Sequence, residues 1–373
     1  MSTELPRKIG FSQIKGLHLS DGSELLARIG GTDAFFDSST RLLWEKIGSQ
    51  KSYCTDASRE ALLEIGRREG EFCKASHVDA LFMTDESYPD RLRECDDAPV
   101  MLYRLGECDL NARHVVSIVG TRRATVYGQK FTSDLVSGLA EKLDDLVIVS
   151  GLAYGIDVAA HKAALQAGVP TVGVVAHGLK TIYPADHRDI AARMVKNGGA
   201  LLTEYTSGAP IHRGNFLARN RIVAGLADVT VIVESEEKGG AMVTASIALA
   251  YNRDVCTVAG RVTDRYSAGP LKLIISNRAA LIRNADDLIA QMNWTAKPSA
   301  TATPELNFKK TIENLGPDQR KIIDYLRVND RSTVNEMVGA LDISYSTLTA
   351  RLMELEMDDI VTALPGSSYS LNI

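Results

Sequence analysis

Short apolar runs that recur through the middle of the chain constrain its fold more than any other feature. Segments with the apolar spacing of helices separate them, and the runs are Val115–Val119, Leu146–Val149, Thr171–Ala176, Ala200–Thr203, Val229–Val233 and Val255–Val258. Nearly continuous apolar strands are typical of a parallel sheet that crossover helices bury on both faces. The pattern therefore predicts an α/β domain over residues 76–293, with an extended Rossmann-like, doubly wound and mostly parallel sheet.

The segments on either side of this domain have different patterns. Residues 1–75 show helical spacing with a break at Gly30-Gly31, and predict a small helical N-terminal domain of the SAM or helix-hairpin-helix kind. Residues 294–316 are rich in Pro, Ala, Thr and Ser, which is typical of a linker. The chain is thus expected to have two domains around the sheet domain, the second after the linker.

Residues 317–373 have the pattern of a winged helix. A helix over Pro317–Val328 precedes a second one that a capping box, Thr333 to Glu336, opens. Ser344 can cap a third helix, and Ile360–Ala363, a Pro365-Gly366 turn and Tyr369–Leu371 predict a hairpin. This domain has five basic residues against nine acidic ones, a net charge of −4. A helix that enters the groove of duplex DNA is normally basic, so a protein-contact or dimer-regulating role is expected instead.

Composition excludes several classes of protein. The chain has 373 residues and a net charge of −5, and no run approaches the roughly 18 to 20 apolar residues of a membrane span. The five cysteines lie far apart without a CxxC pair, so neither a disulfide framework nor a zinc site is expected. A cytoplasmic protein without cofactor or metal is predicted. Any nucleic-acid site must be a local basic patch on an acidic body.

Five loops at the carboxyl ends of the predicted strands are the candidate ligand site, because doubly wound folds bind ligands there. The first holds Gly120, Thr121 and Arg122, whose free backbone N–H groups suit a phosphate, although a plain glycine turn is the alternative. The second holds Gly151 and Gly155, which allow a ligand close approach.

Asp157 and His161 follow the second loop at helical i,i+4 spacing. They could form a metal or acid–base pair, but no third ligand has suitable spacing. A helix-capping Asp157 with a packed His161 is the preferred interpretation.

The other three loops supply most of the positive charge. Lys180 lies in the third loop, Arg219, Asn220 and Arg221 in the fourth, and Lys238, Gly239 and Gly240 in the fifth. Between Tyr205 and Ala227 there is no acidic residue. Arg219 and Arg221 point about 200° apart on a helix, so only one should face a ligand while the other pairs with a carboxylate.

Aromatic residues alternate with these basic groups and are candidates for base stacking; they are Tyr127, Tyr154, Tyr183 and Phe216. Basic groups that follow phosphates, with aromatic faces for bases, are typical of single-strand binding. Each aromatic taken alone is more often part of a core. The sequence contains no GxSxG, P-loop or HExxH motif, so no enzyme activity is expected.

Several motifs in order resemble those of the DNA-processing protein A family (DprA, also called Smf). They are VSIVGTRRATVYG, VSGLAYGIDVAAH, GLKTIYP, NFLARNRIVAGLADVTVIVE and GGAMVTASIALAYNRDV, within residues 85–285. The resemblance implies a recombination mediator that binds single-stranded DNA, loads the RecA recombinase onto it, protects incoming DNA in natural transformation, and forms a homodimer through the Rossmann-like domain. It assigns DNA contacts to the basic residues of the loops.

The chain departs from the family pattern at four places. Tyr154 replaces the arginine of SGxARGID, and Gly239 stands where a serine is usual. Ala259 takes the place of a proline, and Gly269-Pro270-Leu271-Lys272 that of Gly-Thr-Asn-Arg. One phosphate contact could be lost at Tyr154, which predicts weaker DNA binding or more contact with bases.

A nucleotide-processing hydrolase of the lysine-decarboxylase-like group is the alternative function. Those enzymes carry a PGGxGTxxE signature near this position. The corresponding segment here, EKGGAMVTA, has neither that proline nor the downstream catalytic glutamate.

Overall fold

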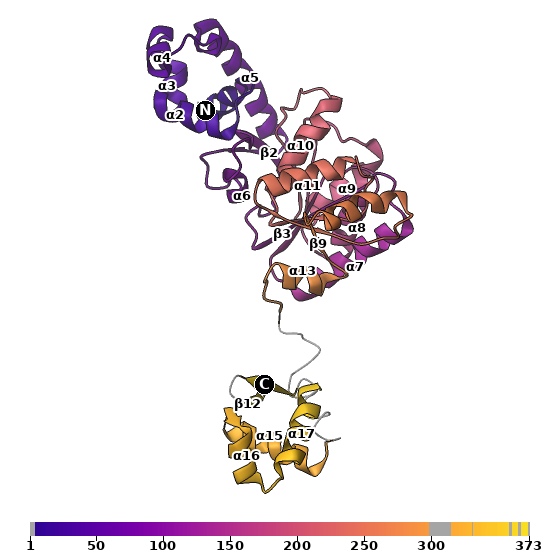
Figure 1. Ribbon diagram of the computed structural model, residues 1–373. Helices are drawn as coiled ribbons and strands as arrows, with labels where there is room; N and C mark the ends of the chain where they lie inside the picture. The colour runs from indigo at the N-terminus through magenta and orange to yellow at the C-terminus, as the bar shows by residue number, and fades with distance from the viewer. Residues whose placement is uncertain (1–3, 298–314, 330, 358–359, 365–366, 372–373) are drawn as a thin grey trace. The chain divides into compact units, whose positions relative to one another are not determined.

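The computed structural model describes residues 4–297, 315–329, 331–357, 360–364 and 367–371 (Figure 1). Contacts divide the chain into two compact units, Met1–Lys297 and Pro298–Ile373. The linker expected at 294–316 lies mostly outside the described residues, and the division into four parts stays a prediction. The first residue of the expected linker, Trp294, is packed, because its ring lies 4.7 Å from the ring of His114 between centroids.

The first unit is built on a sheet whose described strands have the order β1-β2-β6-β5-β4-β3-β7-β8-β9. β1 and β2 are antiparallel to their neighbours, and all other pairs are parallel. The predicted doubly wound, mostly parallel sheet is confirmed. Its strands are β1 (Val78–Phe82), β2 (Met101–Gly106), β3 (His114–Val119), β4 (Leu146–Ser150), β5 (Thr171–Val174), β6 (Ala200–Thr203), β7 (Val229–Ile232), β8 (Asp254–Thr257) and β9 (Ala280–Leu281).

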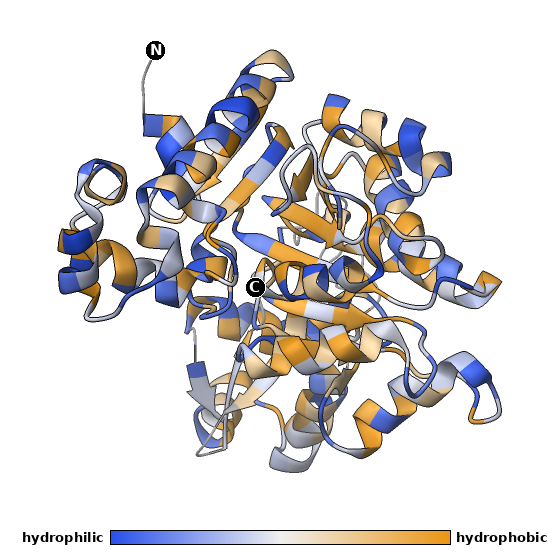
Figure 2. Cartoon of the chain, turned by 90° about the horizontal axis from the view of Figure 1, so that it is seen from above, coloured by the Kyte–Doolittle hydropathy of each residue, from blue (hydrophilic) through white to orange (hydrophobic). Residues whose placement is uncertain are grey.

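Helices cover both faces of this sheet. On β3, Val116 and Ile118 belong to a core shared with α7, α8 and α13, while Val115 and Val119 belong to the core on the opposite face. In Figure 2 the central strands are mostly orange and the surrounding helices show orange and blue sides. The helices are α6 (Asp90–Arg93), α7 (Val126–Lys142), α8 (Ile156–Gln166), α9 (Arg188–Lys196), α10 (Arg213–Gly225), α11 (Gly240–Ala250), α12 (Ala268–Ile275) and α13 (Ala285–Gln291), with short η2 (Ala185–His187) and η3 (Arg265–Ser267).

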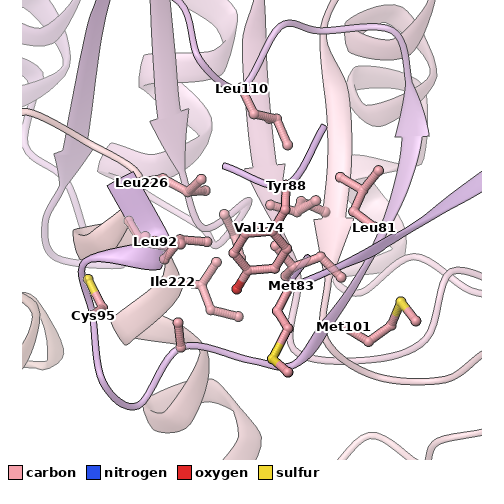
Figure 3. Packing of buried hydrophobic residues seen from close by; sticks show 14 of the residues in the cluster. Leu81, Met83, Tyr88, Leu92, Cys95, Met101, Leu110, Val174, Ile222 and Leu226 are labelled. Carbon is pink, nitrogen blue, oxygen red and sulfur yellow. The ribbon is translucent and has the colours of Figure 1, made fainter. Parts of the chain in front are cut away.

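The N-terminal helices pack directly on this body. They are α1 (Glu4–Ser12), α2 (Leu19–Ile29), α3 (Thr32–Asp37), α4 (Thr40–Ile47), η1 (Ser52–Cys54) and α5 (Asp56–Ala75). The predicted break at Gly30-Gly31 is present, because both glycines have positive φ, at 95° and 108°. One hydrophobic core runs from these helices into the sheet. In Figure 3 the Tyr88 ring lies among Leu92, Val174 and Ile222, and its hydroxyl donates to Pro99 O at 2.6 Å.

The second unit has its own core, the three helices and the hairpin that were expected, and a third strand over residues 331–333 that was not predicted. These elements are α15 (Pro317–Val328), α16 (Val334–Leu341), α17 (Tyr345–Met357), β10 (Arg331–Thr333), β11 (Val361–Leu364) and β12 (Ser368–Leu371). The Thr333–Glu336 capping box is present. Leu348, Leu352 and Leu355 share the buried face of α17. The Pro365-Gly366 turn lies outside the described residues.

Candidate nucleic-acid interface

A cavity of about 730 Å³ opens at the carboxyl ends of β3 and β7. These neighbouring strands mark the point where the strand order reverses, since β4, β5 and β6 follow on one side of β3 while β7, β8 and β9 lie on the other. Ligands of doubly wound folds bind at this position. Among the predicted residues, the cavity is lined by Gly120, Thr121, Arg122, Tyr183, Phe216, Arg219, Asn220, Gly239 and Gly240.

The loop after β3 is held in place by the end of β7. Thr121 N donates to Glu234 O at 2.6 Å, and the Glu234 carboxylate accepts from Thr125 N at 2.9 Å and from the Thr125 hydroxyl. Thr125 caps α7 by accepting from Gly128 N at 3.1 Å. A Cβ at Gly120 would overlap Ile156 and Glu234 O. The backbone beside Arg122 is therefore fixed before any ligand binds.

Positive charge and aromatic surface meet on one wall of the cavity. The Arg122 guanidinium lies 5.8 Å from the centre of the Phe216 ring, and that ring meets Tyr183 edge-on at 5.6 Å. Tyr183 is exposed. A wall of this kind offers an arginine for a phosphate and an aromatic face for a base.

Arg213 also lines the cavity, although its sequence position alone predicted no role for it. It is the first residue of α10, which His212 caps by accepting from Gly214 N at 3.1 Å. Arg213 is exposed, and the ion pairs of the described residues include neither it nor Arg122. Its place at the start of a helix that follows an acid-free loop could have indicated this position. Glu236 lines the cavity too, paired with Arg265 at 3.0 Å.

Arg219 forms the floor of the cavity rather than its rim. Its side chain is 5% exposed, and Nη1 donates to Val174 O at 2.9 Å. Burial lowers the pKa of Arg219 while the nearby Asp157 carboxylate raises it. For the Asp157 carboxylate, burial has the opposite effect and raises its pKa, while the nearby Arg219 charge lowers it. A Cβ at Gly151 would overlap the Arg219 guanidinium, so the glycine makes room for this arginine.

His161 is packed, as the preferred interpretation has it. Nδ1 lies 2.7 Å from Thr171 Oγ1, and burial lowers the pKa of His161 to about 3. The helix-cap assignment of Asp157 needs correction, because Gly155 occupies the N-cap position and Asp157 lies in the first turn. Within the described ranges there is no group of three His, Cys, Asp or Glu side chains that could hold a metal ion.

Of the basic residues predicted for the rim, which were Arg122, Lys180, Lys238 and one of Arg219 and Arg221, the cavity lining contains Arg122 and Arg219. Arg221 is paired with Glu204 at 2.6 Å, as the helical spacing predicted for one of the two arginines. Lys180 Nζ lies 5.3 Å from the centre of the Phe72 ring, outside the cavity lining. Lys238 is exposed but does not line the cavity either. Neither do Gly151 and Gly155.

Two of the candidate stacking residues have other contacts. Tyr154 donates to Asp186 Oδ2 at 2.8 Å and meets the His187 ring edge-on. Tyr127 donates to Ala259 O at 2.8 Å. Both rings are about half exposed and lie outside the cavity lining, whereas Tyr183 and Phe216 lie in it.

Fold and site together define a doubly wound α/β protein with a pre-formed basic and aromatic pocket at its switch point. The family model of DNA recombination-mediator protein A matches residues 79–293, and a model of winged helix-turn-helix DNA-binding domains matches 319–362. The chain belongs to the DNA recombination-mediator protein A family, as the resemblance predicted.

Individual relatives agree with this assignment. The DNA processing protein DprA of Bacillus subtilis is 35% identical over 216 residues, 58% of this chain and 71% of the relative. The structure of DNA processing protein A from Streptococcus pneumoniae matches with a TM-score of 0.63 at 29% identity, covering 78% of this chain and 98% of that one. That of Helicobacter pylori, reported for its single-stranded DNA binding mode, matches with a TM-score of 0.52 at 31% identity, covering 58% and 95%. Across the described segments, no helix is long and apolar enough to cross a membrane.

Proposed function

We propose that the chain binds single-stranded DNA in the switch-point cavity and acts as a recombination mediator. In this role it loads RecA onto incoming DNA during DNA processing and natural transformation, in the cytoplasm. The observation that carries the proposal is the cavity wall where Arg122 and Arg213 lie beside the Tyr183–Phe216 pair. The single-strand binding described for the H. pylori relative supports it. All five cysteines are free and buried, which suits a reducing compartment.

The combination of a local basic patch and exposed aromatic rings favours a single strand over a duplex as the ligand. The chain has a net charge of −5, so DNA is attracted only where basic residues gather. A duplex keeps its bases stacked and inaccessible, whereas a single strand can place a base on Tyr183 or Phe216 and a phosphate beside Arg122. Base–aromatic stacking contributes about 1–3 kcal/mol per base.

The test is a fluorescence-anisotropy titration of the full chain with an oligo-dT and a matched duplex at several salt concentrations. We expect tighter binding of the single strand, and a large loss of affinity in the double variant Arg122→Glu, Arg213→Glu. Each lost phosphate contact should reduce the log–log salt slope by about 0.7. Arg219 is unsuitable for charge reversal, because it is buried against Asp157 and its loss would perturb folding.

Lys162→Glu is the matched control for these charge reversals. Lys162 is exposed on α8 and does not line the cavity. Its variant should bind oligo-dT like the wild type. Unchanged affinity in the Arg122, Arg213 double variant would place the DNA site elsewhere.

No enzyme activity is proposed. The hydrolase alternative is not favoured, because the segment Lys238–Thr244 lacks its signature and the matched family model describes a recombination mediator. Release of nucleobase or phosphate above background from nucleotides incubated with the chain would revive that alternative.

We also propose that the chain forms a homodimer through the β9 edge of its sheet. β9 pairs only with β8, so its outer edge has unpaired backbone groups in the described structure. Leu281 on this strand is 49% exposed, and Ile275, at the end of the preceding α12, is 81% exposed. Exposed edges with apolar side chains are suited to pairing with another chain.

A further inference from the structure

Helix α5 of the N-terminal region contacts a loop of the proposed DNA site through a buried carboxylate. α5 packs against β1 at one edge of the sheet. Glu69 on this helix is 5% exposed. Its two oxygens accept from Ser207 N and from the Ser207 hydroxyl, both at 2.7 Å. Ser207 lies in the loop between β6 and α10, which ends at the cavity-lining Arg213. A carboxylate buried in this way must be hydrogen-bonded, so the contact fixes the loop.

The fixed loop in turn supports the loop that carries Lys180 and Tyr183. A Cβ at Gly178 would overlap Thr206 O and the Ser207 backbone, so the two loops touch without free space. Tyr183 N donates to His177 Nε2 at 3.1 Å, and the other ring nitrogen of His177 lies 2.9 Å from Gly178 O. Because Nε2 accepts, Nδ1 carries the proton and donates to that carbonyl. Hydrogen bonds and close contacts thus connect Glu69 to Tyr183.

A second contact joins the same helix to the same loop. The Lys180 ammonium lies 5.3 Å from the centre of the Phe72 ring, one helical turn along α5 from Glu69. A cation over an aromatic face is stabilised by roughly 0.5–1 kcal/mol at exposed sites. Lys180 has few other constraints, since it is exposed and takes part in none of the ion pairs among the described residues. Phe72 therefore sets where this charge lies.

We propose that α5 supports the DNA site from outside. Glu69 is the positioning residue for Tyr183, and Phe72 is the positioning residue for Lys180. The inference rests on the proposed single-strand binding, with Lys180 as a phosphate contact of the same strand beside the cavity rather than in its lining. Without Glu69, Ser207 loses both acceptors and the two loops gain conformations that do not fit DNA. Affinity falls because the free protein must then order these loops on binding. The N-terminal region is in this way coupled to DNA binding without touching the strand.

The experiment measures oligo-dT affinity of the full chain by anisotropy, and base stacking by quenching of a 2-aminopurine placed in the oligonucleotide. Glu69→Gln keeps the side-chain volume but exchanges one acceptor for a donor, and Phe72→Leu removes the ring. We expect Glu69→Gln to weaken binding about three- to tenfold, the effect of one lost hydrogen bond. Phe72→Leu should weaken it about two- to fivefold, the effect of one lost cation–π contact. Glu69→Gln should also reduce the 2-aminopurine quenching, and Phe72→Tyr should restore wild-type affinity.

Glu71→Gln is the matched control, since Glu71 is an exposed residue of the same helix. Hydrogen exchange of residues 177–184 should quicken in Glu69→Gln and stay unchanged in Glu71→Gln. If the wild type binds oligo-dT and both Glu69→Gln and Phe72→Leu bind it equally well, the positioning role is wrong while the proposed function stands. If the wild type does not bind oligo-dT, the proposed function itself fails.

Discussion

At the scale of single residues, Tyr154 stands where the motif resemblance led us to expect an arginine. Its hydroxyl donates to Asp186, and this hydrogen bond raises the pKa of Tyr154. An arginine placed here would meet the same carboxylate and be largely neutralised. We therefore predict that Tyr154→Arg alone changes oligo-dT affinity less than about threefold. The double variant Tyr154→Arg, Asp186→Asn should bind about three- to tenfold more tightly at low salt, with a salt slope steeper by about 0.7.

Anisotropy titrations across salt measure both quantities, with Asp186→Asn as the control. A full gain of affinity in Tyr154→Arg alone would show that Asp186 does not neutralise this position. A gain in Asp186→Asn alone would assign the effect to repulsion between Asp186 and DNA instead.

The buried His161 should make the stability of the fold depend on pH. Its pKa is lowered by burial from an ordinary 6.5 to about 3, so between these values the unfolded chain binds a proton that the folded chain excludes. The contribution of His161 to the free energy of unfolding is therefore complete well above pH 6.5 and is lost as the pH falls toward 3. From pH 7 to pH 5 the loss is about 2 kcal/mol.

Urea unfolding of the wild type and His161→Gln at both pH values isolates this contribution from that of the carboxylates. The variant is expected to be less stable at pH 7 but to lose about 2 kcal/mol less on going to pH 5. Equal losses in the two proteins would mean that His161 is protonated in the folded state.

At the scale of elements, the sequence predicts the parallel strands well and the edges poorly. Each central strand is apolar on both faces, as on β3, where Val115 to Val119 are all buried, and this makes a strand evident without its neighbours. β1 is buried irregularly and pairs only with β2, so its strand character depends on a partner distant in sequence. β9 has only two residues.

The candidate site was predictable in its loops but not in the depth of its side chains. Strand ends and the acid-free loop indicate where Arg122 and Arg219 gather, and helical spacing separates Arg219 from Arg221. That Arg219 lies under the cavity depends on Gly151 and Asp157, which the fold brings to it from another strand end. Likewise, Glu204 becomes the partner of Arg221 only when β6 and α10 pack.

The side chains of helix α17 indicate that the winged helix does not bind duplex DNA. Its one arginine, Arg351, is paired with Glu354 at 2.6 Å, while Tyr345 and Met353 are exposed on the same helix. We propose that this surface contacts protein rather than the groove of duplex DNA. A chain ending at residue 297, the end of the first compact unit, should then bind both oligo-dT and duplex within about twofold of the full chain.

Arg351→Glu provides the matched test in the full chain. Reversal of an arginine that reads DNA would weaken duplex binding about tenfold or more. We expect no change, measured by anisotropy with a duplex at low salt. A marked loss in either protein would assign DNA binding to the winged helix.

At the scale of the whole molecule, the proposed homodimer would determine how the chain binds a long single strand. One copy brings a single switch-point cavity on a body of net charge −5, so a strand that leaves the cavity meets little attraction elsewhere. Two copies joined at their β9 edges would offer two cavities to one strand. The second binding event is then intramolecular, and affinity for a strand that reaches both sites exceeds that of either site alone.

Ile275→Lys separates the effect of dimerisation from that of binding in one cavity, because Ile275 is 81% exposed and does not line the cavity. We predict that sedimentation velocity shows a dimer for the wild type and a monomer for this variant. Affinity for a six-nucleotide oligo-dT should be unchanged, while affinity for a long oligo-dT should fall about tenfold or more as avidity is lost.

Val328→Lys is the control, since Val328 is equally exposed at 83% but belongs to the other unit. A variant that remains dimeric would move the interface away from this edge, and a monomeric variant with full affinity for the long strand would show that one cavity is enough.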